Sequence, residues 1–127
     1  MIKGDKVNEK EQLLRRVYRI DKKYRDPKTG KPSSRAFAPR PKKDDGKLSV
    51  DIERLTTIEK AVIDPLRFVL YRISASFIFK IGLNCIYDPI LEENFENIAH
   101  AVVIGFDEED ESLSGILARK AELVNYQ

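Results

Sequence analysis

The sequence predicts an α+β fold: a single domain over residues 1–127, with a mixed sheet of about five or six strands and two or three helices. The chain of 127 residues has the length of one ordinary domain, and its 42% hydrophobic content is enough for a core. Several short segments alternate apolar and polar residues, as half-buried strands do. Three other segments repeat apolar residues at helical spacing, next to residues that favour helix N-caps.

The first half of the chain is predicted to alternate strands with basic loops. The polar first dozen residues (1–12) are expected to fray. The first loop contains Asp-Pro, Thr-Gly and Lys-Pro, and the second closes on Asp45-Gly46, all of which are typical of turns. The predicted strands are 13–20, 33–39 (SSRAFAP) and 48–55, and the predicted basic loops are 21–32 and 40–47.

The second half is predicted to mix helices and strands. Thr56 or Thr57 is a suitable N-cap for a short helix limited by Pro65, and Ser74 is a suitable N-cap for a helix that ends at Gly82. If the strands on either side of this second helix are parallel, their crossover should be right-handed. Further predicted elements are strands over 68–73, 84–90 and 98–106, a polar linker over 91–97, and helices over 74–82 and 112–124.

The charge is divided unevenly along the chain. Residues 1–43 hold 15 Lys or Arg against 5 Asp or Glu, a net +10, and residues 44–127 hold 8 against 16, a net −8. A basic loop face can bind an acidic protein partner or the phosphates of nucleic acid, or it can simply be solvated. The acidic run DEEDE at 107–111 is interpreted as complementing the dipole of the following helix. The candidate binding residues are Lys22, Lys23, Arg25, Lys28, Lys31, Arg35, Arg40, Lys42 and Lys43.

The sequence contains one histidine and one cysteine, which limits the metal sites and disulfides that it can form. Cys85 cannot form an internal disulfide and is typical of a protein from a reducing compartment. His100 alone cannot build a metal site that needs two imidazoles, and we predict no metal and no cofactor. The N-terminal residues lack the apolar core of a signal peptide, and three charged residues interrupt the most apolar stretch, 68–90. We therefore expect a cytoplasmic protein without membrane contact.

An enzymatic alternative depends on His100, which lies in the apolar segment IAHAVVIGF. Histidine can act as a general base beside a nucleophile, and the candidates are Ser33, Ser34, the turn at Ser74, and Cys85. The structural interpretation is that His100 is a hydrogen-bonded core residue and that Cys85 is an inert buried thiol. ADP-ribosyltransferase-like toxins offer a second comparison, because they place an arginine on an early strand and Ser-x-Ser on a later one. Arg19 in RVYRI, or Arg72 with Ser74 and Ser76 in YRISAS, resembles this arrangement. The alternative function is therefore a small enzyme that processes nucleotides or nucleic acid, either a hydrolase or an ADP-ribosyltransferase-like protein.

Several short elements resemble a family of small bacterial α+β proteins. They are SSRAF, matching SSxxF; DGKLSV, matching DGxLSV; the DP-containing strand NCIYDPI; and NIAHAVVIG, matching N-x-AHA-x-x-x-G. The resemblance covers most of residues 14–120 and implies an order of elements but no assigned activity. Such proteins often belong to gene pairs. The leading hypothesis is a non-enzymatic accessory protein of a bacterial defence or toxin–antitoxin type module, with a protein partner encoded nearby.

Overall fold

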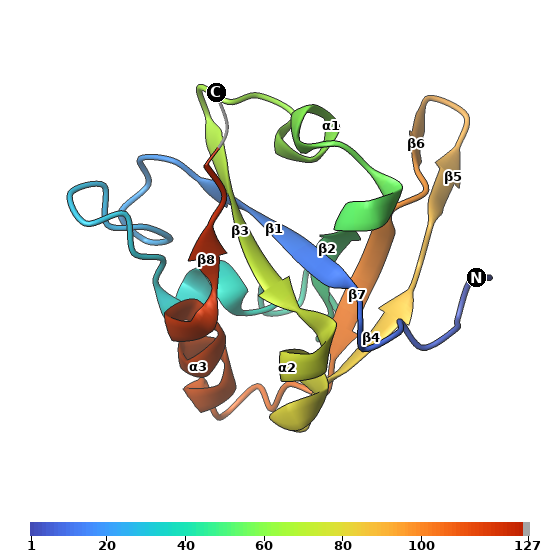
Figure 1. The fold of residues 1–127 in the computed structure, drawn as a ribbon. Helices are drawn as coiled ribbons and strands as arrows, with labels where there is room; N and C mark the ends of the chain where they lie inside the picture. Colours follow the sequence, from blue (N-terminus) through green and yellow to red (C-terminus); the bar gives the residue numbers. More distant parts are fainter. Residues whose placement is uncertain (126–127) are drawn as a thin grey trace.

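The structure, a computed structural model, describes residues 1–125 and contains eight strands and three α-helices in that range. In chain order the elements are β1 Gln12–Tyr18, the 3-10 helix η1 Ser34–Phe37, β2 Leu48–Ile52, the 3-10 helix η2 Glu53–Leu55, α1 Ile58–Val62, β3 Phe68–Ser74, α2 Ala75–Lys80, β4 Asn84–Tyr87, β5 Ile90–Glu92, β6 Phe95–Asn97, β7 His100–Ile104, α3 Ser112–Lys120 and β8 Glu122–Leu123. Figure 1 shows their arrangement.

The main sheet has six strands in the order β4-β7-β2-β1-β3-β8, and β5 and β6 form a separate hairpin. The predicted α+β domain, with six strands in one sheet and three helices, is therefore confirmed. Every pairing among residues 1–125 is antiparallel, whereas the sequence suggested a mixed sheet. The strands on either side of α2 are not neighbours, so no parallel crossover forms there.

The two faces of the sheet are covered unequally. Leu13 of β1 lies opposite Ile52 and Ile73, and these residues belong to the main core beneath η1, α2 and α3. On the other face, Leu14 and Leu70 belong to a smaller cluster covered by α1. Because α1 is only five residues long, much of this second face is left open.

Residues 1–12 were expected to fray, but the structure pairs the start of the chain with β4. The Gly4 amide donates to the Tyr87 oxygen at 2.8 Å, and the Val7 amide donates to the Cys85 oxygen at 2.9 Å. Val7 is fully buried, with 1% of its surface exposed. Residues 4–7 therefore pair with β4, whose outer edge would otherwise present unpaired backbone groups.

The predicted strand over SSRAFAP is wrong. Residues Ser34–Phe37 form a 3-10 helix, and Ala36 and Phe37 enter the main core. The Phe37 ring meets the Tyr71 ring edge-on, with 6.4 Å between ring centroids. The short apolar stretch of this segment is buried by packing under α3 and not by strand pairing.

Two further segments differ from the sequence interpretation. The polar linker over 91–97 contains most of the β5–β6 hairpin, in which Glu92 pairs with Phe95 across a two-residue turn. The predicted C-terminal helix ends at Lys120, because β8 then pairs with the edge of β3. This pairing gives the backbone new partners and overrides the helical spacing that continues to Val124.

Local signals in the middle of the chain are confirmed. Thr57 and Ser74 act as N-caps, because their side-chain oxygens accept from the amides of Lys60 and Phe77. Gly82 follows α2 with a φ of +93°, which suits glycine. The strand predicted over 98–106 is an inner strand of the sheet, β7. Within residues 1–125 we find no helix with the length and apolarity needed to cross a membrane.

Candidate functional site

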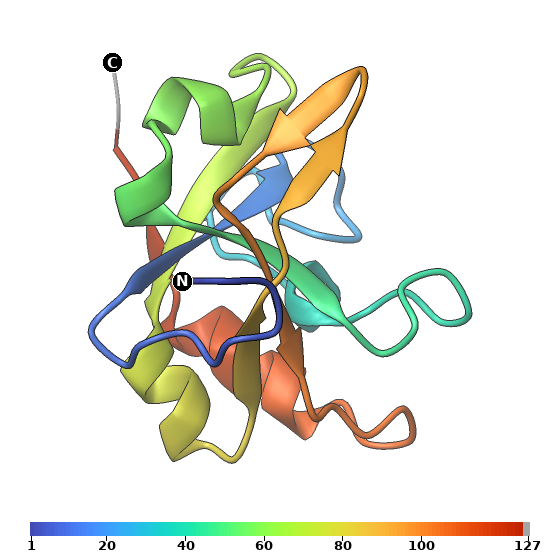
Figure 2. The ribbon, with the colours of Figure 1, turned by 90° about the vertical axis from the view of Figure 1, so that its right-hand side faces the viewer.

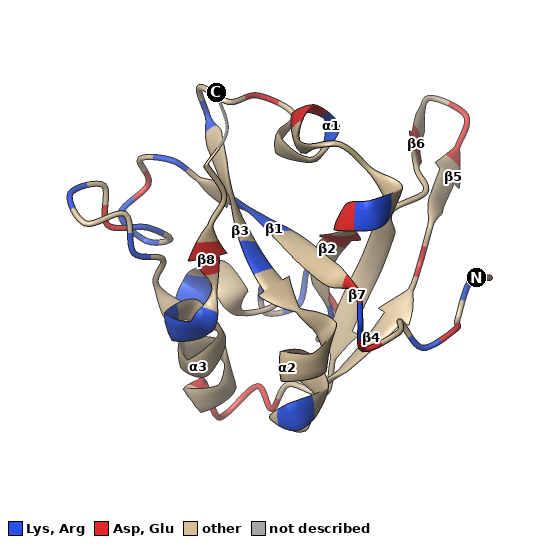
Figure 3. Ribbon diagram, viewed as in Figure 1, with Lys and Arg blue, Asp and Glu red and all other residues tan. Residues whose placement is uncertain are grey.

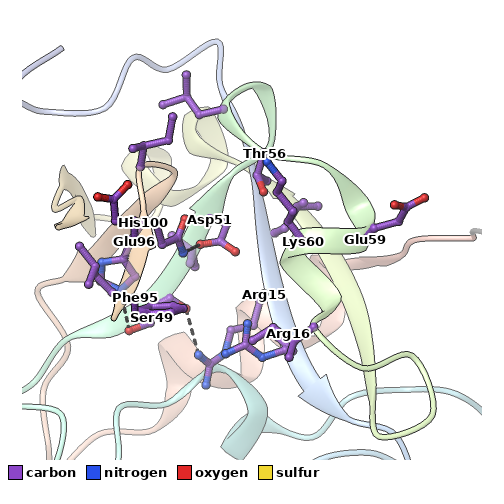
Figure 4. Close-up of a pocket in the computed structure, with 17 residues that line it drawn as sticks. Arg15, Arg16, Ser49, Asp51, Thr56, Glu59, Lys60, Phe95, Glu96 and His100 are labelled. Carbon is purple, nitrogen blue, oxygen red and sulfur yellow. Dashed lines mark hydrogen bonds between the residues drawn. The ribbon is translucent and has the colours of Figure 1, made fainter. Parts of the chain in front are cut away.

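A groove of about 730 Å³ opens on the sheet face opposite to α3 (Figure 4). Strands β1, β2 and β7 supply its floor. One wall comes from η2 and α1, and the other comes from the β5–β6 hairpin. Figure 2 shows α1 and the hairpin standing on either side of this region. The open part of the sheet is thus a walled site that combines apolar and charged side chains.

The strand register brings His100 and Ser49 together on the groove floor. Strands β2 and β7 pair Asp51 with His100, and Ser49 lies two residues before Asp51 on the same face. His100 Nε2 is 3.0 Å from the Ser49 hydroxyl oxygen. Only 13% of the His100 side chain is exposed, whereas Ser49 is exposed. A serine hydroxyl that is open to the groove therefore contacts a largely buried imidazole.

The main-chain oxygen of Asp88 fixes the tautomer of His100. It lies 2.6 Å from Nδ1, and because a carbonyl oxygen only accepts, Nδ1 must carry the hydrogen. In the neutral ring, Nε2 then accepts a hydrogen bond from the Ser49 hydroxyl. The Asp88 carboxylate oxygen Oδ2 also lies 3.6 Å from Nδ1. Ser49, His100 and Asp88 thus occupy the positions of a nucleophile, a base and the group that orients the base.

An Asp51–Asn97 pair connects the hairpin to the floor. Asn97 Nδ2 donates to Asp51 Oδ1 at 2.8 Å, and Asn97 Oδ1 accepts from the Ala99 amide at 3.0 Å. Asp51 is buried, with 8% of its surface exposed, so this hydrogen bond is shielded from water. The pair fixes the hairpin wall next to His100.

Arg15 places a positive charge beside the backbone of Ser49. Its Nη1 donates to the Ser49 main-chain oxygen at 2.9 Å, and its Nε donates to the Ala36 oxygen at 2.8 Å. Burial, followed by the nearby charge of Arg16, lowers the pKa of Arg15 from 12.5 to about 10. Arg15 therefore remains protonated at neutral pH and contributes a fixed positive charge at the groove.

The nine basic residues identified from the sequence divide into two groups. Figure 3 shows the Lys and Arg positions of the first basic loop at the left of the molecule. Seven of the nine are exposed and also have no ion pair within residues 1–125. They are Lys22, Lys23, Lys28, Lys31, Arg35, Lys42 and Lys43.

The two remaining basic residues are engaged within the protein. Arg25 is buried, with Nε donating to the Tyr71 hydroxyl at 2.9 Å and Nη1 to the Arg19 oxygen at 3.0 Å. Its assignment as a binding residue is wrong, because the first loop folds over its guanidinium. Arg40 is exposed but forms an ion pair with Asp44 at 2.9 Å.

A second depression, of about 390 Å³, lies between the basic loops and the acidic turn. Arg35 and Arg40 line one side, and Asp107, Glu108 and Asp110 line the other. In Figure 2 the loop over 40–47 and the turn over 107–111 project from the same side of the molecule. The folded chain thus brings part of its acidic half next to part of its basic half.

The other proposed partners of His100 lie elsewhere. Both ring nitrogens are occupied by Asp88 and Ser49, and Ser74 caps α2. Ser34 begins η1, which packs on the opposite face of the sheet. Cys85 also faces the main core, and burial raises the pKa of its thiol to about 12. The Cys85–His100, Ser34–His100 and Ser74–His100 pairs are therefore not formed.

The sequence reasoning missed the groove partners of His100. Ser49 and Asp51 were placed only within the strand predicted over 48–55, as residues without a functional role. Asp88 was placed in the DP-containing strand predicted over 84–90, and Asn97 in the polar linker over 91–97. The available signal was the alternation in LSVDI, which places Ser49 and Asp51 on one face together. The contact with His100 additionally requires the β2–β7 register.

Fold and site together define a class of protein: an antiparallel α+β domain with a serine–histidine pair in an open groove. Comparison with known family models, with curated proteins and with solved structures gives no match. Within residues 1–125 no group of three His, Cys, Asp or Glu side chains is arranged to hold a metal ion. The function is therefore inferred from the groove itself.

Proposed function

We propose that this protein is a small hydrolase that cleaves an ester bond with Ser49 as nucleophile and His100 as base. The observation that carries the proposal is the 3.0 Å contact between His100 Nε2 and Ser49 Oγ, with the tautomer fixed by Asp88. An activated serine needs a base within hydrogen-bond reach and a third group that orients the base. The contact lies on the floor of a groove that is large enough to admit a small substrate.

The proposed reaction has two steps. Ser49 Oγ attacks the ester carbonyl carbon while its proton moves to His100 Nε2. The carbon–oxygen bond to the alcohol breaks, and the proton on Nε2 passes to the departing alkoxide. Water then attacks the acyl group on Ser49, with His100 again taking and returning the proton, and the carboxylic acid leaves. The main-chain oxygen of Asp88 stays hydrogen-bonded to His100 Nδ1 and stabilises the imidazolium that forms in each step.

Two further features support this role. Arg15 donates to the Ser49 main-chain oxygen and so holds the backbone that carries the nucleophile. Three of the elements that carry the family resemblance also meet in this groove. DGKLSV supplies Ser49, the DP-containing strand supplies Asp88, and the N-x-AHA element supplies Asn97 and His100.

The proposal is tested with a fluorophosphonate probe and with 4-nitrophenyl esters. We expect the probe to label the peptide that contains Ser49. S49A and H100A should each lower ester hydrolysis by roughly 100-fold or more, because each removes a partner of the proton transfer. S76A is the matched control, since Ser76 is an exposed serine on α2 outside the groove. Wild-type hydrolysis by S49A, in a variant that melts like the wild type, would reject the hydrolase.

A second candidate function is binding of an acidic protein partner by the basic loops. The observation that favours it is the set of seven exposed lysines and arginines without an ion pair, from Lys22 to Lys43. Such a surface attracts negatively charged partners at long range. The accessory role in a bacterial defence or toxin–antitoxin type module belongs to this second candidate and is tested by charge reversal in the basic loops.

A further inference from the structure

Arg16 has a free hydrogen-bonding edge in the groove. It lies on β1, is exposed, and lines the groove together with Ser49. Its Nη1 donates to the Ala61 oxygen at the end of α1 at 3.1 Å, and its guanidinium lies 5.3 Å from the Phe68 ring centroid. Within residues 1–125, its Nε and Nη2 groups make no hydrogen bond. The side chain is thus held at one end, and the edge that binds carboxylates and phosphates is left available.

Strand register places this edge on the same surface as the nucleophile. Leu14 of β1 pairs with Asp51 of the antiparallel strand β2. Arg16 lies two residues after Leu14 and Ser49 lies two residues before Asp51, so both are displaced in the same direction along the sheet. Both side chains therefore project from the groove face at a similar level. Figure 4 shows Arg16 next to Arg15, across the site from His100. A bound molecule can contact Arg16 while one of its bonds lies next to Ser49.

The rest of the groove limits what the substrate can be. Lys60 adds an exposed cation on the α1 wall, and Glu59 and Glu96 add two carboxylates; none of the three forms an ion pair within residues 1–125. These carboxylates disfavour a chain with many negative charges, such as a nucleic-acid strand. Ile90, Phe95 and Ile98 give the hairpin wall an apolar surface. The lining therefore suits a molecule that has one anionic group and an otherwise apolar body.

We propose that the substrate is a small ester with a single anionic group, a carboxylate or a phosphate, which Arg16 binds while Ser49 attacks the ester bond. This proposal rests on the hydrolase function described above. It goes further by assigning Arg16 as the residue that selects the substrate.

The experiment compares a neutral ester, 4-nitrophenyl acetate, with an anionic one, the 4-nitrophenyl half-ester of glutarate. The wild type should prefer the glutarate ester in kcat/KM. R16Q should lower the ratio of anionic to neutral kcat/KM by roughly 10-fold or more, mainly through KM, because one charge-assisted contact is lost. R16K should lower the ratio less, since lysine keeps the positive charge but lacks the paired N–H donors of the guanidinium. R119Q, which removes an exposed arginine of α3, should leave the ratio unchanged.

Binding measurements separate failure of this proposal from failure of the hydrolase. Glutarate and inorganic phosphate are titrated into the wild type, R16Q and R16K by calorimetry, and thermal unfolding checks that each variant is folded. Weaker binding of either anion by folded R16Q supports the assignment of Arg16 even if no ester is cleaved. The stronger anion identifies carboxylate or phosphate as the preferred group. An unchanged kcat/KM ratio, or equal anion binding by wild type and R16Q, overturns the proposal.

Discussion

Arg25 and Lys28 lie three positions apart in the same basic loop, but their surroundings differ. Arg25 is 9% exposed and donates to the Tyr71 hydroxyl, which itself donates to the Gly30 oxygen at 2.5 Å. Lys28 is exposed, and its side chain makes no hydrogen bond or ion pair within residues 1–125. The Arg25–Tyr71–Gly30 connection ties the loop to the centre of β3. The same charge is thus structural at one position and available to solvent at the other.

R25A should lower the free energy of unfolding by about 2 kcal/mol, because a buried charged donor with two partners is removed. K28A is the matched control and should change it by less than about 0.5 kcal/mol. Urea denaturation of the three proteins measures both values. Equal stability of R25A and K28A would contradict a structural role for Arg25.

At the scale of elements, one ion pair connects η2 to β3. Arg72 donates from Nε to Glu53 Oε1 at 2.7 Å and from Nη2 to Glu53 Oε2 at 2.6 Å. This two-point hydrogen bond from Arg72 holds the pKa of Glu53 below its ordinary value of 4.5. A carboxylate with a lowered folded-state pKa stabilises the fold above its unfolded pKa, and loses that effect as the pH falls through the folded-state value.

E53Q should therefore lower the free energy of unfolding at neutral pH, and the difference from the wild type should shrink below about pH 4.5. The pair is partly exposed, so a loss of about 1 kcal/mol is expected. Denaturation curves at pH 7 and about pH 3 measure the change. E93Q, at the exposed tip of the β5–β6 hairpin, provides the control. A difference between wild type and E53Q that stays constant with pH would exclude the stabilising ion pair.

Elements set by local signals could be predicted, and elements set by distant contacts could not. Ser74 and Gly82 mark the limits of α2 in the sequence, because capping depends on neighbouring residues. η1 has its conformation because Phe37 packs against Tyr71 from β3. The helical spacing after Lys120 is overridden because β8 finds hydrogen-bond partners on the edge of β3. No local pattern contains those partners.

The same limit applies to the candidate site. His100 was identified as its base because it is the single histidine in an apolar strand. Its partner Ser49 is 51 positions away, and their contact depends on which residues of β2 and β7 face each other. A shift of the register by one residue would turn Ser49 to the opposite face of the sheet. The identity of the serine thus depends on the strand register, which the sequence left open.

At the scale of the whole molecule, folding reduces the separation of charge that the sequence suggests. The acidic turn at 107–111 and the loop at 40–47 line one depression, so part of the positive charge faces carboxylates of the same chain. The lysines outside this depression do not face these carboxylates, and they are the ones that would contact an acidic partner. They include Lys22 and Lys23 in the first loop and Lys42 and Lys43 in the second.

Reversing the charge at Lys22, Lys23, Lys42 and Lys43 should abolish capture of an acidic partner and leave the unfolding curve unchanged. Pull-down from host extract measures capture, and the double variant K10E/K80E reverses exposed lysines elsewhere as a control. Capture of nucleic acid instead would appear as a steep loss of binding with salt, because phosphate contacts release counterions. Unchanged capture by the fourfold variant would exclude the basic loops as the binding surface.

The position of β7 between β4 and β2 has a consequence for synthesis on the ribosome. Strand β2 is translated about fifty residues before β7, yet its hydrogen bonds on that side must wait for His100–Ile104. Until then β2 and β4 each present an unpaired edge, and unpaired edges attract other nascent chains. The serine–histidine groove can therefore form only after most of the chain has been made.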